Sequence, residues 1–158
     1  MSLILAAPNF QFPFYLHKKI NMAKRIFSIV VALLVSMAII MGFEQLGGLL
    51  FKTPAIDPKD NKTISDMMQH MPIAAFLWLL LGYAVSSFLG GLIATFISGR
   101  KQSQPAMIVG AFLLVGGIMN FIMIPYHPIW VMITAVLLFI PCAWLGYLVA
   151  KKKKETAA

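Results

Sequence analysis

The chain has 158 residues, of which 60% are hydrophobic and 11% are charged, whereas a typical soluble domain carries about a quarter charged residues. This composition excludes an ordinary water-soluble fold, and the length suits four spans of about 20 to 25 residues that each cross a bilayer core of about 30 Å. A formal net charge of +8 would favour nucleic-acid binding in a soluble protein, but here the positive residues flank apolar stretches, so no nucleic-acid partner is expected.

Four apolar stretches predict transmembrane helices joined by short polar connections. The spans are expected over residues 26–51, 72–98, 106–124 and 128–150. Pro105 precedes the third span and Pro128 opens the fourth, and proline is favoured in the first turn of a helix. We therefore predict an all-α fold with a single transmembrane domain over residues 22–150, built as a bundle of four antiparallel helices in the lipid bilayer.

The distribution of positive charge predicts the orientation of the bundle. Ten of the 13 Lys and Arg residues lie before the first span, between the second and third, or after the fourth, including the basic tail over 151–158. The remaining loop is neutral, because its lysines are matched by aspartates: Lys52, Lys59 and Lys62 with Asp57, Asp60 and Asp66. Since cytoplasmic flanks retain positive charge during insertion, both termini are expected in the cytoplasm.

The first 21 residues show no helical period and contain Pro8 and Pro13. Met22 is followed by Ala-Lys-Arg and an apolar run, which is typical of the start of a bacterial membrane protein. We expect residues 1–21 to be an irregular or interfacial tail, with translation starting at Met22, and we expect the bacterial inner membrane as the location. Ser36-Met37-Ala38 resembles a signal-peptide cleavage site, but the apolar run continues through it.

Small residues recur at every fourth position of the second span, where they form one stripe along the helix. In lipid, such a stripe permits close approach of another backbone. It predicts packing inside the bundle, and the alternative is the seam of a homo-oligomer. The stripe consists of Gly82, Ser86, Gly90, Ala94 and Ser98.

Polar side chains gather near those span ends that are predicted to face outward. Glu44, His70 and His127 are candidate metal ligands, because a carboxylate and two imidazoles can bind a divalent metal or relay protons. Polar residues at a membrane surface are also readily solvated, so the same pattern is compatible with no site. The whole predicted outer polar rim comprises Glu44, Asp66, His70, Asn120, Tyr126 and His127.

Met67-Met68-Gln69-His70-Met71 places three thioethers and an imidazole close together. Thioethers favour Cu(I), which makes a soft-metal site one interpretation of this segment. The alternative is a short amphipathic helix lying on the membrane, because Ile64, Met67, Met68 and Met71 have the i, i+3, i+4, i+7 spacing.

Several chemical signatures are absent from the sequence. It contains no P-loop, no GxSxG, no HExxH and no CxxC pair, and its second, third and fourth spans carry no ionisable residue at depth. We therefore assign no catalytic residue and no cofactor, and the chain is not expected to be an enzyme.

The chain resembles a group of small four-span bacterial membrane proteins of unknown function. The features that carry the resemblance are the Glu near the end of the first span, the Asp-containing outer loop, Met71-Pro72, Gly90-Gly91 and Pro125-Tyr126-His127-Pro128-Ile129-Trp130. The small multidrug resistance exporters are similar in span count, but their carboxylate lies deep in the first helix, whereas Glu44 is expected near its end. Membrane-associated glutathione transferases also have four spans, but their basic and amide cofactor residues have no match here.

Two functions from different classes remain open at this stage. The first is a structural or accessory membrane protein, which is a homo-oligomer or part of a larger membrane complex. The second is a small transporter or channel whose mouth is formed by the outer polar rim. A closed apolar interior would favour the first, and a cavity that reaches the rim residues would favour the second. A metal-dependent enzyme would require His70 and His127 to converge on Glu44.

Overall fold

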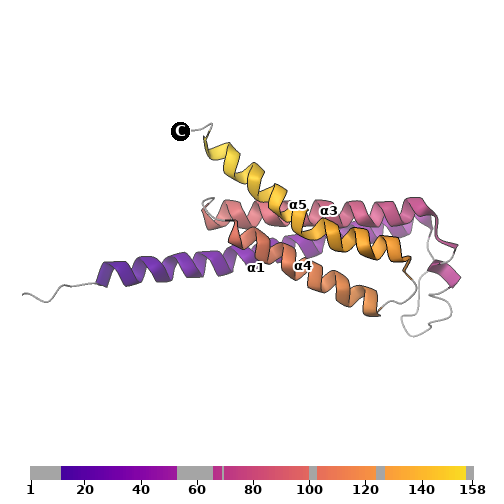
Figure 1. Cartoon of the computed structure of the whole chain (residues 1–158), viewed down its shortest axis with the longest axis horizontal. Coiled ribbons are helices and arrows are strands. Elements are labelled where there is room, and N and C mark those ends of the chain that lie inside the picture. Colours follow the sequence, from indigo (N-terminus) through magenta and orange to yellow (C-terminus); the bar gives the residue numbers. More distant parts are fainter. Residues whose placement is uncertain (1–11, 53–65, 69, 100–102, 124–126, 156–158) are drawn as a thin grey trace, which may run out of the picture.

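A computed structural model describes residues 12–52, 66–68, 70–99, 103–123 and 127–155. Its long helices are α1 (Phe12–Phe51), α3 (Ile73–Ser98), α4 (Gln104–Met123) and α5 (Ile129–Glu155), and residues 66–68 and 70 form a short helical segment (Figure 1). Within these ranges all regular secondary structure is helical, so the predicted all-α fold is confirmed.

Within the described part of the chain, four helices are long and apolar enough to cross a membrane. The spans are Met22–Phe51, Ile73–Ser98, Gln104–Met123 and Ile129–Lys151. At a rise of 1.5 Å per residue, the shortest of these helices, α4, extends over about 30 Å, which matches the hydrocarbon core of a bilayer. The prediction of a multi-pass membrane protein is therefore confirmed, with span boundaries close to those expected.

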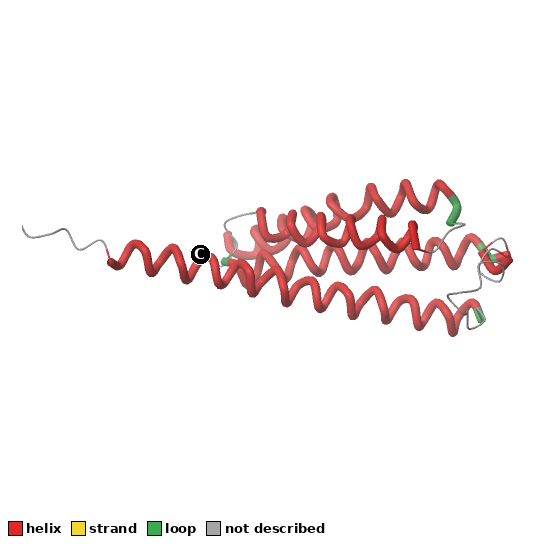
Figure 2. The backbone as a smooth tube through the Cα atoms, turned by 90° about the horizontal axis from the view of Figure 1, so that it is seen from below, coloured by secondary structure: helices red, strands yellow, loops and turns green. Residues whose placement is uncertain are grey.

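The first helix starts earlier than the sequence suggested. It begins at Phe12, and its N-terminal part projects beyond the other helices (Figure 2). Residues 12–21 are helical, where an irregular or interfacial tail was expected, and residues 1–11 lie outside the described part. Pro13 is compatible with this start, because a proline in the first turn lacks only an N–H that has no partner within the helix.

The helix α3 packs against all three other long helices, whereas α1 packs mainly on α3 and only lightly on α4. Four members of the small-residue stripe are buried, namely Gly82, Ser86, Gly90 and Ala94, and Ser98 is partly buried. A Cβ atom at Gly82 would lie 2.8 Å from the Phe43 side chain, and Ser36 Oγ donates a hydrogen bond to the Ser86 carbonyl oxygen over 3.0 Å. The stripe therefore faces α1 at its closest approach.

A second close crossing joins α3 to α5. A Cβ atom at Gly91 would collide with the backbone carbonyl of Ala143, and one at Gly146 would collide with the backbone of Phe88. Ser87 Oγ also donates a hydrogen bond to the Phe139 carbonyl oxygen. The bundle is consequently tight on the α5 side of α3 and more open between α1 and α4.

Candidate functional site

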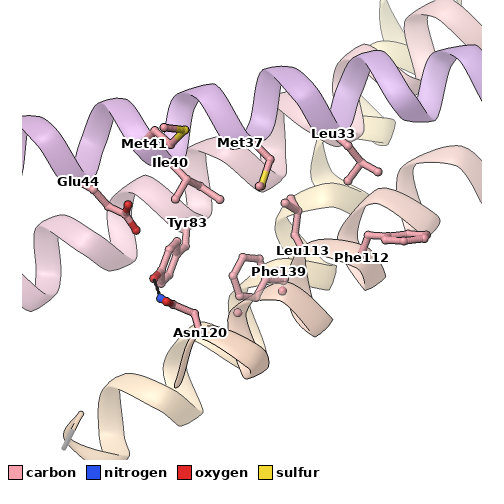
Figure 3. A pocket seen from close by; sticks show the side chains of 12 residues that line it. Leu33, Met37, Ile40, Met41, Glu44, Tyr83, Phe112, Leu113, Asn120 and Phe139 are labelled. Carbon is pink, nitrogen blue, oxygen red and sulfur yellow. Dashed lines mark hydrogen bonds between the residues drawn. The ribbon is translucent and has the colours of Figure 1, made fainter. Parts of the chain in front are cut away.

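Glu44 is the one acidic or basic residue inside the four spans, away from their ends. It lies seven residues before the end of α1 at Phe51, which is about 10 Å along a helix. Its side chain points toward Tyr83 of α3 (Figure 3). An ionisable side chain in a membrane span nearly always faces the bundle interior or a cavity, and such a residue marks a candidate functional site.

Tyr83 and Asn120 complete a polar group with Glu44. Tyr83 lies in the middle of α3 with 3% of its surface exposed, and its ring packs against Phe139 with centroids 5.4 Å apart. Asn120 Nδ2, from the last turn of α4, donates a hydrogen bond to the Tyr83 hydroxyl oxygen over 3.4 Å. Because the hydroxyl accepts this bond, its own hydrogen can be donated to a carboxylate or a ligand. We call Glu44, Tyr83 and Asn120 the polar trio.

A pocket of about 520 Å³ separates α1 from α4, and we call it the membrane pocket (Figure 3). Two glycines on α4, Gly116 and Gly117, help to make this space, since neither contributes a side chain. The polar trio supplies the polar part of a wall that is otherwise mainly apolar. The remaining lining residues are Leu33, Met37, Ile40, Met41, Phe112, Leu113 and Phe139.

A second pocket of about 260 Å³ lies where α1 ends and α3 begins, and we call it the end pocket. It shares the polar trio with the membrane pocket, so the trio is the polar junction of two spaces. Aromatic rings and three methionines form most of its wall. Besides the trio, it is lined by Phe43, Gly47, Gly48, Phe51, Met67, Met68, Met71, Ala75, Phe76, Trp78, Leu79 and His127.

The structure brings together only part of the predicted outer polar rim. Glu44, Asn120 and His127 all line the end pocket, whereas His70 and Asp66 are not among its lining residues. His70 Nδ1 instead donates a hydrogen bond to the Asp66 carbonyl oxygen over 2.7 Å. Tyr126 lies outside the described residues. No three His, Cys, Asp or Glu side chains gather as a metal site in the described part of the chain.

Tyr83 was not identified from the sequence, although it lines both the membrane pocket and the end pocket. Tyrosines in membrane proteins concentrate at the two interfaces. Tyr83 is ten residues into α3, which places it about 15 Å from the start of that helix. A phenol hydroxyl at that depth needs a hydrogen-bond partner from another helix. The position of Tyr83 within its span was therefore the signal in the sequence that could have identified it.

A hydrogen bond ties α1 to α3 beside the end pocket. Trp78 Nε1 donates to the Phe43 carbonyl oxygen over 2.9 Å, and the two rings lie 5.1 Å apart. Trp78→Phe keeps most of the ring but removes this donor, so we expect a loss of about 1 kcal/mol of unfolding free energy. Trp144→Phe, at a side chain that is 47% exposed, is the control. Equal thermal unfolding midpoints for the two variants would contradict this role of Trp78.

No family model, curated protein or solved structure matches this chain. The structure supports one part of the resemblance to small four-span membrane proteins, namely the four helices that can span a membrane.

Proposed function

We propose that this chain is a small membrane transporter that binds a lipophilic organic cation in the membrane pocket, with Glu44 as its counter-ion. The observation that carries the proposal is a carboxylate at the end of a mainly apolar pocket inside a membrane span. Among the described residues, no lysine or arginine lines the membrane pocket beside Glu44. A cationic ligand would compensate the Glu44 charge.

The shape and lining of the membrane pocket support a ligand with an apolar body. Its volume of about 520 Å³ lies within the range of about 300 to 1,000 Å³ that is usual for small-molecule sites, which combine apolar walls with a few polar groups. The hydroxyl of Tyr83 and the amide of Asn120 would orient a polar substituent, whereas the leucine, methionine and phenylalanine side chains would contact the apolar part.

The alternative of a purely structural protein predicts a closed apolar interior. A pocket that reaches Glu44 and Asn120 favours the transporter. We place the chain among transporters rather than enzymes because the polar trio borders a mainly apolar pocket between membrane-spanning helices.

We further propose that the four helices alternate in direction in a bacterial inner membrane, with both termini in the cytoplasm. The support is the positive charge that flanks the spans on that side. The end pocket would then open on the outer side. A C-terminal green fluorescent protein fusion is expected to fluoresce in cells, since this reporter matures in the cytoplasm, and a dark fusion at normal expression would contradict the orientation.

The central prediction concerns Glu44→Gln, which keeps the shape of the side chain but removes its charge. Purified protein is titrated with tetraphenylphosphonium, and we expect the Kd to rise about tenfold or more, which corresponds to about 1.4 kcal/mol of lost binding. Proteoliposomes that contain the wild-type chain should also take up this cation faster than empty vesicles.

Triphenylphosphine oxide is the matched control ligand, because it has similar aromatic groups but no net charge. Its affinity is expected to be the same for wild type and Glu44→Gln. Equal tetraphenylphosphonium affinity for both proteins would eliminate Glu44 as the counter-ion. Binding without uptake would retain the site but refute transport.

A further inference from the structure

The end pocket offers a binding chemistry that the membrane pocket lacks. Met67, Met68 and Met71 line it, and all three side chains are partly buried. Met68 and Met71 also pack against the hydrophobic core, so their positions are held by the bundle. Thioether sulfur is a soft ligand that selects Cu(I) and similar ions over hard divalent cations.

Side chains from two other parts of the chain reach the same space. His127 precedes α5, and its ring makes a T-shaped contact with the Phe121 ring at a centroid distance of 5.1 Å. Trp78 comes from α3, and its ring orientation is held by the bond to the Phe43 carbonyl oxygen. An indole face attracts cations more strongly than the other aromatic side chains do.

We infer that the end pocket is a binding site for a soft monovalent metal ion, Cu(I) or Ag(I), held by the sulfur atoms of Met67, Met68 and Met71 and by the imidazole of His127. These groups come from separate segments that the fold brings to one pocket. The set keeps the three thioethers of the soft-metal interpretation of the sequence but takes its imidazole from His127, because His70 does not line the end pocket. This inference does not depend on the organic cation, since none of these four residues lines the membrane pocket.

The test uses Ag(I), which is a redox-stable probe for Cu(I) sites, and the full chain in detergent micelles. The variant is Met67→Leu/Met68→Leu/Met71→Leu. Its matched control is Met107→Leu/Met119→Leu/Met123→Leu, which removes the same number of thioethers from residues that line neither pocket. Methionine-to-leucine changes conserve volume, so both proteins are expected to fold.

The wild type and the control are expected to bind one Ag(I) per chain with similar affinity. For the end-pocket variant we expect the Kd for Ag(I) to rise by about 100-fold or more. Loss of a group that only supports a metal ligand already lowers metal affinity by about 10- to 100-fold, and this variant removes three direct ligands. X-ray absorption of the Ag(I)-loaded wild type should show sulfur neighbours together with a nitrogen neighbour.

Three results would overturn the inference. The first is a wild type that does not bind Ag(I). The second is a control variant that loses as much Ag(I) affinity as the end-pocket variant. The third is an absorption spectrum that shows only oxygen and nitrogen neighbours around Ag(I). The spectrum is measured on the wild type, so a spectrum without sulfur neighbours refutes the site even if a variant misfolds. Tetraphenylphosphonium titration of the same samples reports separately on the membrane pocket, so either proposal can fail alone.

Discussion

Gly91→Ala is expected to lower the unfolding free energy of the bundle by about 2 to 3 kcal/mol, the upper part of the usual range for overpacking in a protein core. The added methyl group would collide with the backbone carbonyl of Ala143, so α3 and α5 must separate. A backbone group cannot rotate away as the end of a side chain can. Gly146→Ala should cost a similar amount, because its methyl group would collide with the backbone of Phe88 on the same crossing.

The same substitution at two other glycines provides the control. A Cβ atom at Gly42 or Gly116 would have no neighbour within 4 Å. Alanine is favoured over glycine in a helix by about 1 kcal/mol, so both variants should be as stable as the wild type or more stable. Denaturant titration of all four variants in one detergent checks the prediction. Comparable losses at Gly91 and Gly116 would mean that α3 and α5 do not cross as closely as described.

The spans and the α3 stripe are the features that the sequence predicts well. Span limits follow from apolar length, which the bilayer fixes independently of tertiary packing. The i, i+4 spacing of Gly82, Ser86 and Gly90 places them on one helix face whatever that face contacts. Gly91 and Gly146 do not share such a spacing, because they lie on different helices. Their importance depends on which helices cross, and periodicity within one segment carries no information about that.

The site was predictable only in part for the same reason. Glu44 and Asn120 were identified because they lie near span ends that were predicted to face outward. That both of them border one pocket with Tyr83 depends on how α1 and α4 pack on α3. The membrane pocket arises because α1 rests mainly on α3 and only lightly on α4. A gap between two helices has no signature in the sequence of either, so the sequence favoured a polar rim rather than a pocket between α1 and α4.

Gly116→Phe is expected to weaken tetraphenylphosphonium binding by about tenfold or more while the fold is retained. Gly116 lines the membrane pocket, and no atom lies within 4 Å of where its Cβ atom would stand, so a phenyl ring can occupy the pocket without displacing a helix. A ligand that needs the same volume must then be excluded, or bind with most of its apolar surface left uncovered.

Gly42→Phe is the matched control, since Gly42 is also an exposed helical glycine with open space around it but lines neither pocket. Its affinity for tetraphenylphosphonium should equal that of the wild type. If Gly116→Phe binds normally while Glu44→Gln does not, the cation occupies the end pocket, because Glu44 borders both spaces and Gly116 borders only one. The soft metal ion and the organic cation would then compete for one site, and Ag(I) should displace tetraphenylphosphonium from the wild type.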